Sequence, residues 1–210
     1  MPGDGPAPPV LRPAVLGDVR AVRTLLAHAF ADDPLLAWLF PAPSTRAESA
    51  AAYSGLNVEA YLALRVPPAP TRGRVVEADG SVVAAALWRW PDDDVAAPGL
   101  LPTPAGLLAA LVGHSHLRVV AAGFAHLARA RPTTPHAYLH YLAVDAAHRG
   151  HGHARRLVEE GLGRAADDGL PALLETANPA NVALYERLGF AVRAEVRLGD
   201  GPPMWVMTTD

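Results

Sequence analysis

Apolar positions recur along this 210-residue chain with two spacings, alternate residues and the spacing of a helix face. Alternation and short apolar runs predict strands at 10–15, 74–78, 82–90, 137–144, 172–176, 190–197 and 204–208. The helical spacing predicts helices at 18–30, 35–40, 44–67, 105–131, 151–168 and 179–188. Because strand and helix alternate from 137 to 197, the pattern indicates an α/β fold with helices packed on a central sheet.

Glycine and proline mark the ends of these elements. Asp79-Gly80 separates two apolar runs, and a dipeptide that tolerates positive φ predicts a hairpin there. Asp33-Pro34 interrupts the first helix, and a break is expected near Gly113 in the helix at 105–131. Residues 1–9 are rich in proline and glycine, so we expect a disordered tail followed by one domain over residues 10–210.

The charge balance and the lack of one residue type exclude several function classes. The 18 basic and 21 acidic residues give a net charge of -3, which argues against a nucleic-acid-binding surface and a basic membrane patch. There is no cysteine, which excludes disulfides, thiolate metal sites and acyl-cysteine intermediates. No uninterrupted apolar run reaches about 18 residues. We therefore expect a soluble, cytoplasmic protein that acts on small molecules and binds neither nucleic acid nor membranes.

A glycine- and arginine-rich segment follows the predicted strand at 137–144. It reads Asp145-Ala-Ala-His148-Arg149-Gly150-His151-Gly152-His153-Ala154-Arg155-Arg156. Glycines at 150 and 152 let backbone N–H groups approach an anion, and a helix N-terminus adds partial positive charge. A nucleotide P-loop is excluded because there is no lysine, and a dinucleotide fingerprint because Arg155 replaces the third small residue. A phosphate site of another type is indicated, with an ordinary strand-to-helix turn as the alternative.

Two motifs in this region resemble those of a known enzyme family. The run Arg149-x-x-Gly152-x-Ala154 is similar to the Gln/Arg-x-x-Gly-x-Gly/Ala signature of the GNAT superfamily of N-acetyltransferases. Asn178 to Phe190, which ends in Tyr-Glu-Arg-Leu-Gly-Phe, resembles the second hallmark of that family. The resemblance covers roughly 136–208, and shorter pieces resemble the puromycin N-acetyltransferase branch. It implies a mixed, mostly antiparallel twisted sheet of about seven strands, splayed at the cofactor site, with helices on both faces.

The resemblance also implies roles for individual residues, with acetyl-CoA as the co-substrate. Backbone groups of Leu142, Ala143 and Val144 would bind pantetheine and the acetyl carbonyl. Asn181 would hydrogen-bond the cofactor, and Tyr185 would protonate the leaving thiolate. The pyrophosphate would lie against six consecutive residues: Arg149, Gly150, His151, Gly152, His153 and Ala154. A core aromatic that packs its helix on the sheet is the alternative interpretation of Tyr185.

The acceptor amine must lose a proton, so a base with a pKa near neutrality is expected. His140 is the first candidate, because alternation places Tyr138, His140 and Leu142 on one face, and the strand is similar to one in serotonin N-acetyltransferase that carries a histidine. Glu175, at the end of the next strand, is the second candidate. Water, and a half-buried histidine with a purely structural role, are the alternatives.

The acceptor pocket and the histidines have weaker signals. The aromatic residues Trp38, Tyr53 and Trp88, with Trp90, are candidates to line the pocket, although aromatics on apolar faces are usually core. Asp32 or Asp33 would hold the ammonium group. His148, His151 and His153 lack the i, i+4 spacing and the further carboxylate or cysteine of a metal site, so we expect no metal.

These signals together predict an N-acetyltransferase that transfers acetyl directly to a primary amine of a small molecule, such as an aminonucleoside or another antibiotic. Three alternatives stay open at this point: a non-catalytic sensor of acyl-CoA, an acetyltransferase of protein N-termini or lysines, and a metal-dependent hydrolase. Members of the family are frequently dimers, and a homodimer is an expectation that rests on this resemblance alone.

Overall fold

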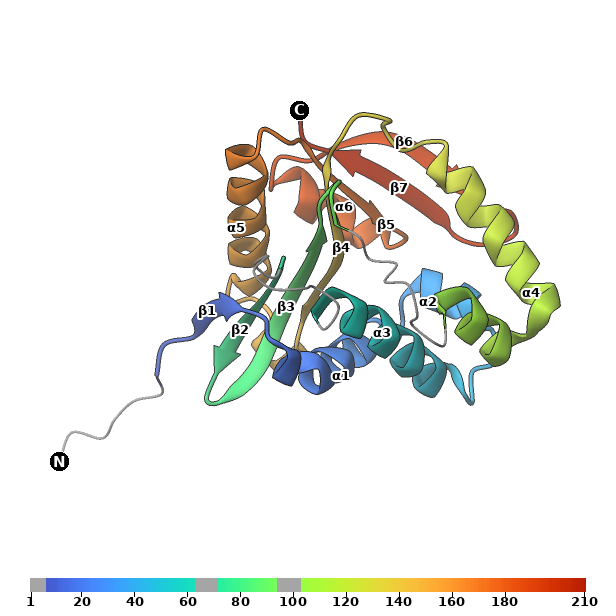
Figure 1. The fold of residues 1–210 in the computed structure, drawn as a ribbon, viewed down its shortest axis with the longest axis horizontal. Helices are drawn as coiled ribbons and strands as arrows, with labels where there is room; N and C mark the ends of the chain where they lie inside the picture. The colour runs from blue at the N-terminus through green and yellow to red at the C-terminus, as the bar shows by residue number, and fades with distance from the viewer. Residues whose placement is uncertain (1–6, 63–71, 94–102) are drawn as a thin grey trace.

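The computed structural model describes residues 7–62, 72–93 and 103–210, and its centre is a seven-stranded sheet (Figure 1). The strand order is β1-β2-β3-β4-β5-β7-β6. The strands are β1 (Val10–Pro13), β2 (Gly73–Ala78), β3 (Ser81–Arg89), β4 (Ala137–Val144), β5 (Ala172–Thr176), β6 (Ala191–Arg197) and β7 (Pro203–Thr208). The pair β4–β5 is parallel and all other neighbours are antiparallel, which confirms the predicted mixed, mostly antiparallel sheet.

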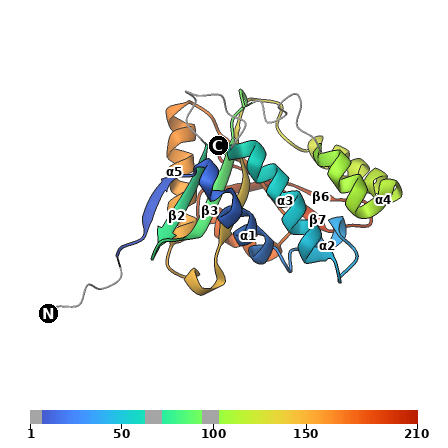
Figure 2. The same ribbon diagram turned by 60° about the horizontal axis from the view of Figure 1, so that its bottom comes forward.

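Helices cover both faces of this sheet. They are α1 (Val19–Ala29), α2 (Pro34–Leu39), α3 (Arg46–Leu62), α4 (Pro104–Ala128), α5 (His153–Asp167) and α6 (Pro179–Glu186), with short 3-10 turns η1 (Leu16–Asp18) and η2 (Ala146–His148). Figure 2 shows α1 and α3 lying across one side of the strands. Because the side chains of α5 and α6 join a different core cluster from those of α1 and α3, these two helix pairs lie on opposite faces.

The local signals that predicted these elements are present in the backbone. Asp79 and Gly80 have φ of 49° and 72°, so the β2–β3 hairpin turns through two residues with positive φ, as predicted. Asp33 begins α2 by accepting a hydrogen bond from the Leu35 N–H at 2.8 Å, with Pro34 at the first helical position. Gly113, with φ of 79°, breaks the helical backbone within α4 where a break was expected.

Within the described part of the chain, α4 is the one helix long and apolar enough to span a membrane by length and composition, with 25 residues and a hydropathy of 1.4. The kink at Gly113 interrupts it. Val120 and Leu108 are buried in one cluster with Phe40, the residue after α2, and Leu127 is buried against strand residues on the sheet. These contacts describe a helix packed on the protein along one side.

Alternating residues of β3 divide the interior between the two faces. Ala84, Ala86 and Trp88 join the cluster under α5, and Ala85 and Leu87 join the cluster under α1 and α3. All five side chains are fully buried. At about 25 cal/mol for each Å² of apolar surface removed from water, such two-sided burial is the main source of stability for the central strands. It also fixes β4 beside β3, and β4 carries the site described next.

Candidate active site

The two parallel strands separate at the centre of the sheet. Strand β4 pairs with β5 only where Ala137–Leu139 lie opposite Ala172–Leu174. Beyond this point β4 continues to Val144 beside β3, without further pairing to β5. One edge of the β4 backbone, including Leu142 to Val144, therefore has N–H and C=O groups that no neighbouring strand satisfies. This is the splay that the family resemblance implied.

A β-bulge at His140 changes which way the β4 side chains face. Leu87 of β3 lies opposite Tyr141, and Trp88 lies opposite Leu139, so His140 is an extra residue in β4. Tyr138 consequently packs on the α4 side, whereas Leu142 packs in the cluster under α5. The prediction that Tyr138, His140 and Leu142 share one face is therefore wrong at Leu142, because a bulge reverses the alternation beyond it.

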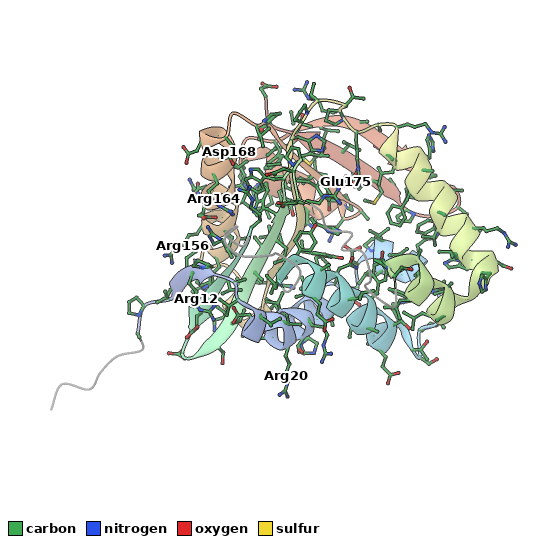
Figure 3. All side chains as sticks on the ribbon, viewed as in Figure 1. Arg12, Arg20, Arg156, Arg164, Asp168 and Glu175 are labelled. Carbon is green, nitrogen blue, oxygen red and sulfur yellow. The ribbon has the colours of Figure 1, made fainter. Side chains whose placement is uncertain are left out.

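A cavity of about 540 Å³ lies at this bulge and splay. It is lined by all three predicted catalytic residues, Tyr185, His140 and Glu175, which come from three different elements. Asn181 and Leu142 also line it. Its polar wall adds Asp33, Arg89, Arg131, Tyr138 and Tyr141, and its apolar wall consists mainly of Phe30, Leu35, Leu36, Leu39, Tyr53 and Phe124. Figure 3 labels Glu175 near the centre of the molecule, which marks the position of this site.

Tyr185 is held with its ring in the core and its edge at the cavity. The side chain is 8% exposed, and its ring packs edge-on against Phe190 at 6.0 Å between ring centres. Burial, and secondarily the charge of Asp33, raises the pKa of the Tyr185 phenol above its usual value. The hydroxyl stays protonated at neutral pH, as a proton donor requires. The helix that carries it begins at Asn178, whose Oδ1 accepts the Ala180 N–H at 3.0 Å. Asn178 is therefore a helix cap.

His140 is neutral in this environment. Burial, and then the charges of Arg89 and Arg131, lower the pKa of His140 to about 3. The hydroxyl of Tyr61 lies 2.6 Å from its Nδ1. Because burial raises the pKa of Tyr61, the phenol is protonated and the contact joins two neutral groups, with the direction of the hydrogen bond set by the imidazole tautomer. A pKa of about 3 differs from the near-neutral value expected of the base.

Glu175 is engaged by other side chains. Its two carboxylate oxygens accept hydrogen bonds from Nε and Nη2 of Arg131 at 2.7 and 2.6 Å, a two-bond pairing. The Tyr138 hydroxyl donates to Oε2 at 3.2 Å. The Glu175 side chain is only 4% exposed, so the carboxylate of this ion pair is buried. This arrangement orients Arg131 and Tyr138 along the polar wall.

The predicted phosphate loop leads from β4 into α5. Gly150 and Gly152 have φ of 81° and 79°, a region that favours glycine, and Gly152 caps α5 without any side-chain bond. A Cβ on either glycine would meet nothing within 4 Å. The space around both glycines is therefore open, as a phosphate requires, and the first N–H groups of α5 have no acceptor within the helix; Arg149 and Ala154 are close in sequence. The residues present thus fit the pyrophosphate of acetyl-CoA.

The histidines of this loop border the anion site. His151 Nδ1 lies 3.0 Å from the Arg149 carbonyl oxygen, and His148 Nδ1 lies 3.1 Å from Asp145 Oδ1. His153 is buried at the start of α5, and burial followed by the nearby positive groups lowers its pKa. Across the described residues there is no group of three or more side chains placed to hold a metal ion.

The predicted acceptor residues divide into two sets. Tyr53 lines the cavity. Trp88 does not, because its fully buried indole packs against Gly161 in the core under α5. Trp38 packs against Gly201 outside the cavity, and its indole N–H donates to Asp200 at 3.1 Å. The prediction that Trp38 and Trp88 line the pocket is therefore wrong, because the packing of the helices on the sheet uses both rings outside the cavity.

The acidic residue at the cavity is Asp33, and the prediction of Asp32 is wrong. Asp32 is exposed and does not line the cavity, whereas its neighbour Asp33 does. The N-cap geometry of Asp33 explains this difference, since capping turns that side chain toward α2 and the interior. Sequence reasoning missed Arg89, Arg131 and Tyr61 as site residues. They belong to segments far from the glycine loop, and only the sheet and helix packing brings them to His140.

This fold and site define an acetyltransferase: a splayed sheet, an anion loop at a helix N-terminus, and a buried phenol in an adjoining cavity. The family model described as Acetyltransferase (GNAT) family matches residues 34–190. This match spans most of the chain, and the chain belongs to the GNAT acetyltransferase family. It is an N-acetyltransferase by class.

Solved structures with the same fold include several N-acetyltransferases. The chain is 25% identical to a Corynebacterium glutamicum protein described as histone acetyltransferase HPA2 and related acetyltransferase, with 97% of this chain and 96% of that chain covered and a TM-score of 0.68. A mosquito arylalkylamine N-acetyltransferase like 5b is 16% identical, with 96% and 99% covered and a TM-score of 0.61. Drosophila melanogaster polyamine N-acetyltransferase is 19% identical, with 96% and 99% covered and a TM-score of 0.60. The last two likenesses establish the fold alone.

Proposed function

We propose that this protein transfers an acetyl group from acetyl-CoA directly to the primary amine of a small molecule. The observation that carries the proposal is the position of Tyr185, a protonated phenol at the edge of a cavity large enough for a small acceptor. The acetylation of arylalkylamines and polyamines by proteins of this fold supports a small-molecule acceptor. The resemblance to the puromycin branch supports an aminonucleoside or another antibiotic as one such acceptor.

Three groups of residues would hold acetyl-CoA. The first N–H groups of α5, with Arg149, would bind the pyrophosphate. The unpaired backbone of Leu142 to Val144 would hydrogen-bond the pantetheine arm, and Asn181 lies where its amide would add a further hydrogen bond. Bound in this way, acetyl-CoA would supply the thioester whose acetyl group is transferred.

Tyr185 supplies the proton that the departing sulfur needs. The amine nitrogen forms a bond to the acetyl carbon, the carbon–sulfur bond breaks, and the thiolate takes the phenolic proton; the phenolate then regains a proton from water, which has received the proton of the amine. Burial disfavours both anions, so the low-polarity surroundings that raise the pKa of Tyr185 raise the proton affinity of the thiolate as well. Because both proton affinities rise together, burial does not by itself prevent proton transfer from the phenol to the thiolate.

The proton of the amine leaves through water in this proposal. His140, with a pKa of about 3, holds a proton too weakly to compete with water-assisted transfer near pH 7, and its Nδ1 is occupied by Tyr61. Glu175 is occupied by Arg131 on both oxygens. We assign these two residues to the architecture of the polar wall, where they orient Tyr61 and Arg131.

The test is thiol release from acetyl-CoA, measured with a panel of amines that includes an arylalkylamine, a polyamine, amino acids, puromycin and a peptide with a free N-terminus. Calorimetry of coenzyme A binding runs in parallel. The proposal predicts tight coenzyme A binding and thiol release with at least one small amine. Binding without release for every amine would instead identify a sensor, and release with the peptide alone would identify a protein acetyltransferase.

A further inference from the structure

Arg89 presents a positive charge to the cavity that the steps above do not use. It is the last residue of β3, and its guanidinium carbon lies 5.6 Å from the ring centre of Tyr138. Within the described ranges no carboxylate lies at ion-pair distance from Arg89, whereas Arg131 is paired with Glu175. A cation in a partly buried wall is costly without an anionic partner. The partner that fits is supplied from within the cavity.

Arg89 lies too far from the phosphate loop to serve the cofactor phosphates. It is paired with Tyr138 near the start of β4. From there β4 continues to Val144 before the loop begins, a rise of roughly 20 Å at about 3.3 Å per residue. The anion that Arg89 would bind therefore belongs to the acceptor.

Asp33 supplies the opposite charge in the same cavity. Its charge acts on the Tyr185 hydroxyl, so it lies toward the proton donor, whereas Arg89 lies beside Tyr138 and acts on His140. An ammonium group is attracted to the Asp33 side and an anionic group to the Arg89 side. The same cavity has an apolar lining that suits a hydrocarbon or aromatic side chain; it includes Phe30, Leu35, Leu36 and Phe124.

We propose that the acceptor is an amino acid with an apolar side chain, whose carboxylate is bound by Arg89 while its amine faces Tyr185; this inference rests on the proposed function. A guanidinium binds a carboxylate through two parallel N–H···O bonds, a geometry that a lysine ammonium does not reproduce. The Tyr138 ring under the guanidinium holds it in place.

The test compares each amino acid with its own amide, so that only the carboxylate changes. Thiol release from acetyl-CoA is measured for phenylalanine against phenylalaninamide and for leucine against leucinamide. The enzymes are the wild type, Arg89→Gln, and Arg20→Gln as a matched loss of charge at an arginine that points into solvent below α1 (Figure 3). The wild type and Arg20→Gln should prefer the acids by about a hundredfold in kcat/KM, and Arg89→Gln should lose that preference.

The outcomes separate this inference from the function on which it rests. An unchanged acid-to-amide ratio in Arg89→Gln, or acetylation of amides and simple amines without any acid, overturns the inference and leaves the acetyltransferase proposal standing. If none of the amines, acids or amides causes thiol release, both the inference and the acetyltransferase proposal are overturned. Coenzyme A binding by calorimetry confirms that Arg89→Gln is folded. If it is not, Arg89→Lys replaces it, with the preference reduced about tenfold.

Discussion

The hydroxyl of Tyr61, on α3, lies 2.6 Å from Nδ1 of His140 at the bulge of β4. Burial sets the charge state of both groups, since it raises the pKa of the phenol and, together with Arg89 and Arg131, lowers that of the imidazole to about 3. The pair is a neutral hydrogen bond that ties α3 to the splayed strand. This relationship gives His140 an architectural role and changes what its substitution should do.

The pH dependence of turnover should survive the loss of His140. A group with a pKa of about 3 is fully deprotonated across pH 5 to 9, so it contributes no limb to the rate profile there. We expect the acidic limb of kcat/KM in His140→Gln at the same pH as in the wild type. A limb that disappears in His140→Gln and persists in Glu175→Gln would restore His140 as the base.

We expect His140 to affect the pH dependence of the free energy of unfolding instead. Its folded-state pKa lies below the unfolded value near 6.5, so the unfolded chain takes up the proton first as the pH falls. The stabilisation that comes from keeping His140 neutral is fully present above pH 6.5, and the free energy of unfolding decreases as the pH falls from there toward 3. Between pH 7.5 and 5.0 the loss from this residue is about 2 kcal/mol. Urea unfolding at both pH values should show this extra loss in the wild type relative to His140→Gln; equal losses would contradict the buried neutral state.

Replacing Gly152 should weaken coenzyme A binding, in addition to the backbone strain that alanine causes at a positive φ. Gly152→Ala and Gly199→Ala each place a Cβ at a positive φ with open space around it, at a cost of about 1–2 kcal/mol in folding. Only Gly152 begins α5 at the proposed pyrophosphate site. Calorimetry should therefore show weaker coenzyme A binding in Gly152→Ala alone. Equal weakening in both variants would locate the phosphates elsewhere.

Two glycines of α5 provide a matched pair for the core under that helix. A Cβ at Gly161 would overlap the indole of Trp88, whereas one at Gly163 would meet nothing within 4 Å. We expect Gly161→Ala to lower the free energy of unfolding by about 1–3 kcal/mol through overpacking. Gly163→Ala should raise it by about 0.5–1 kcal/mol, because alanine favours the helix. Denaturant unfolding of both variants checks this, and a stable Gly161→Ala would contradict the close packing of α5 on β3.

Local patterns predicted the elements and the cofactor half of the site. The bounds of β4 and β5 match the apolar runs at 137–144 and 172–176 to the residue, since strands buried on both faces leave such runs. The Asp79-Gly80 hairpin and the break at Gly113 follow from backbone preferences of single residues. These features depend on neighbours in sequence, which is why sequence alone indicated them.

The acceptor half depends on contacts between distant segments. The bulge at His140 arises from the register of β4 against β3, and no residue within β4 signals it. The pKa of His140 is lowered by burial first and then by Arg89 and Arg131, and both causes come from parts of the chain outside β4. Trp88 is buried against Gly161 of α5, a residue 73 positions away in the sequence, and therefore does not reach the pocket. Residue types alone do not separate a core tryptophan from a pocket tryptophan.

The most direct measurement is the turnover of Tyr185→Phe. Among the described residues the Tyr185 hydroxyl has no hydrogen-bond partner, so its removal should leave the melting temperature and the coenzyme A affinity nearly unchanged. Loss of the proton donor should lower kcat by about a hundredfold to ten-thousandfold with the best amine of the panel. A folded Tyr185→Phe enzyme that binds coenzyme A and releases thiol at the wild-type rate would contradict the account.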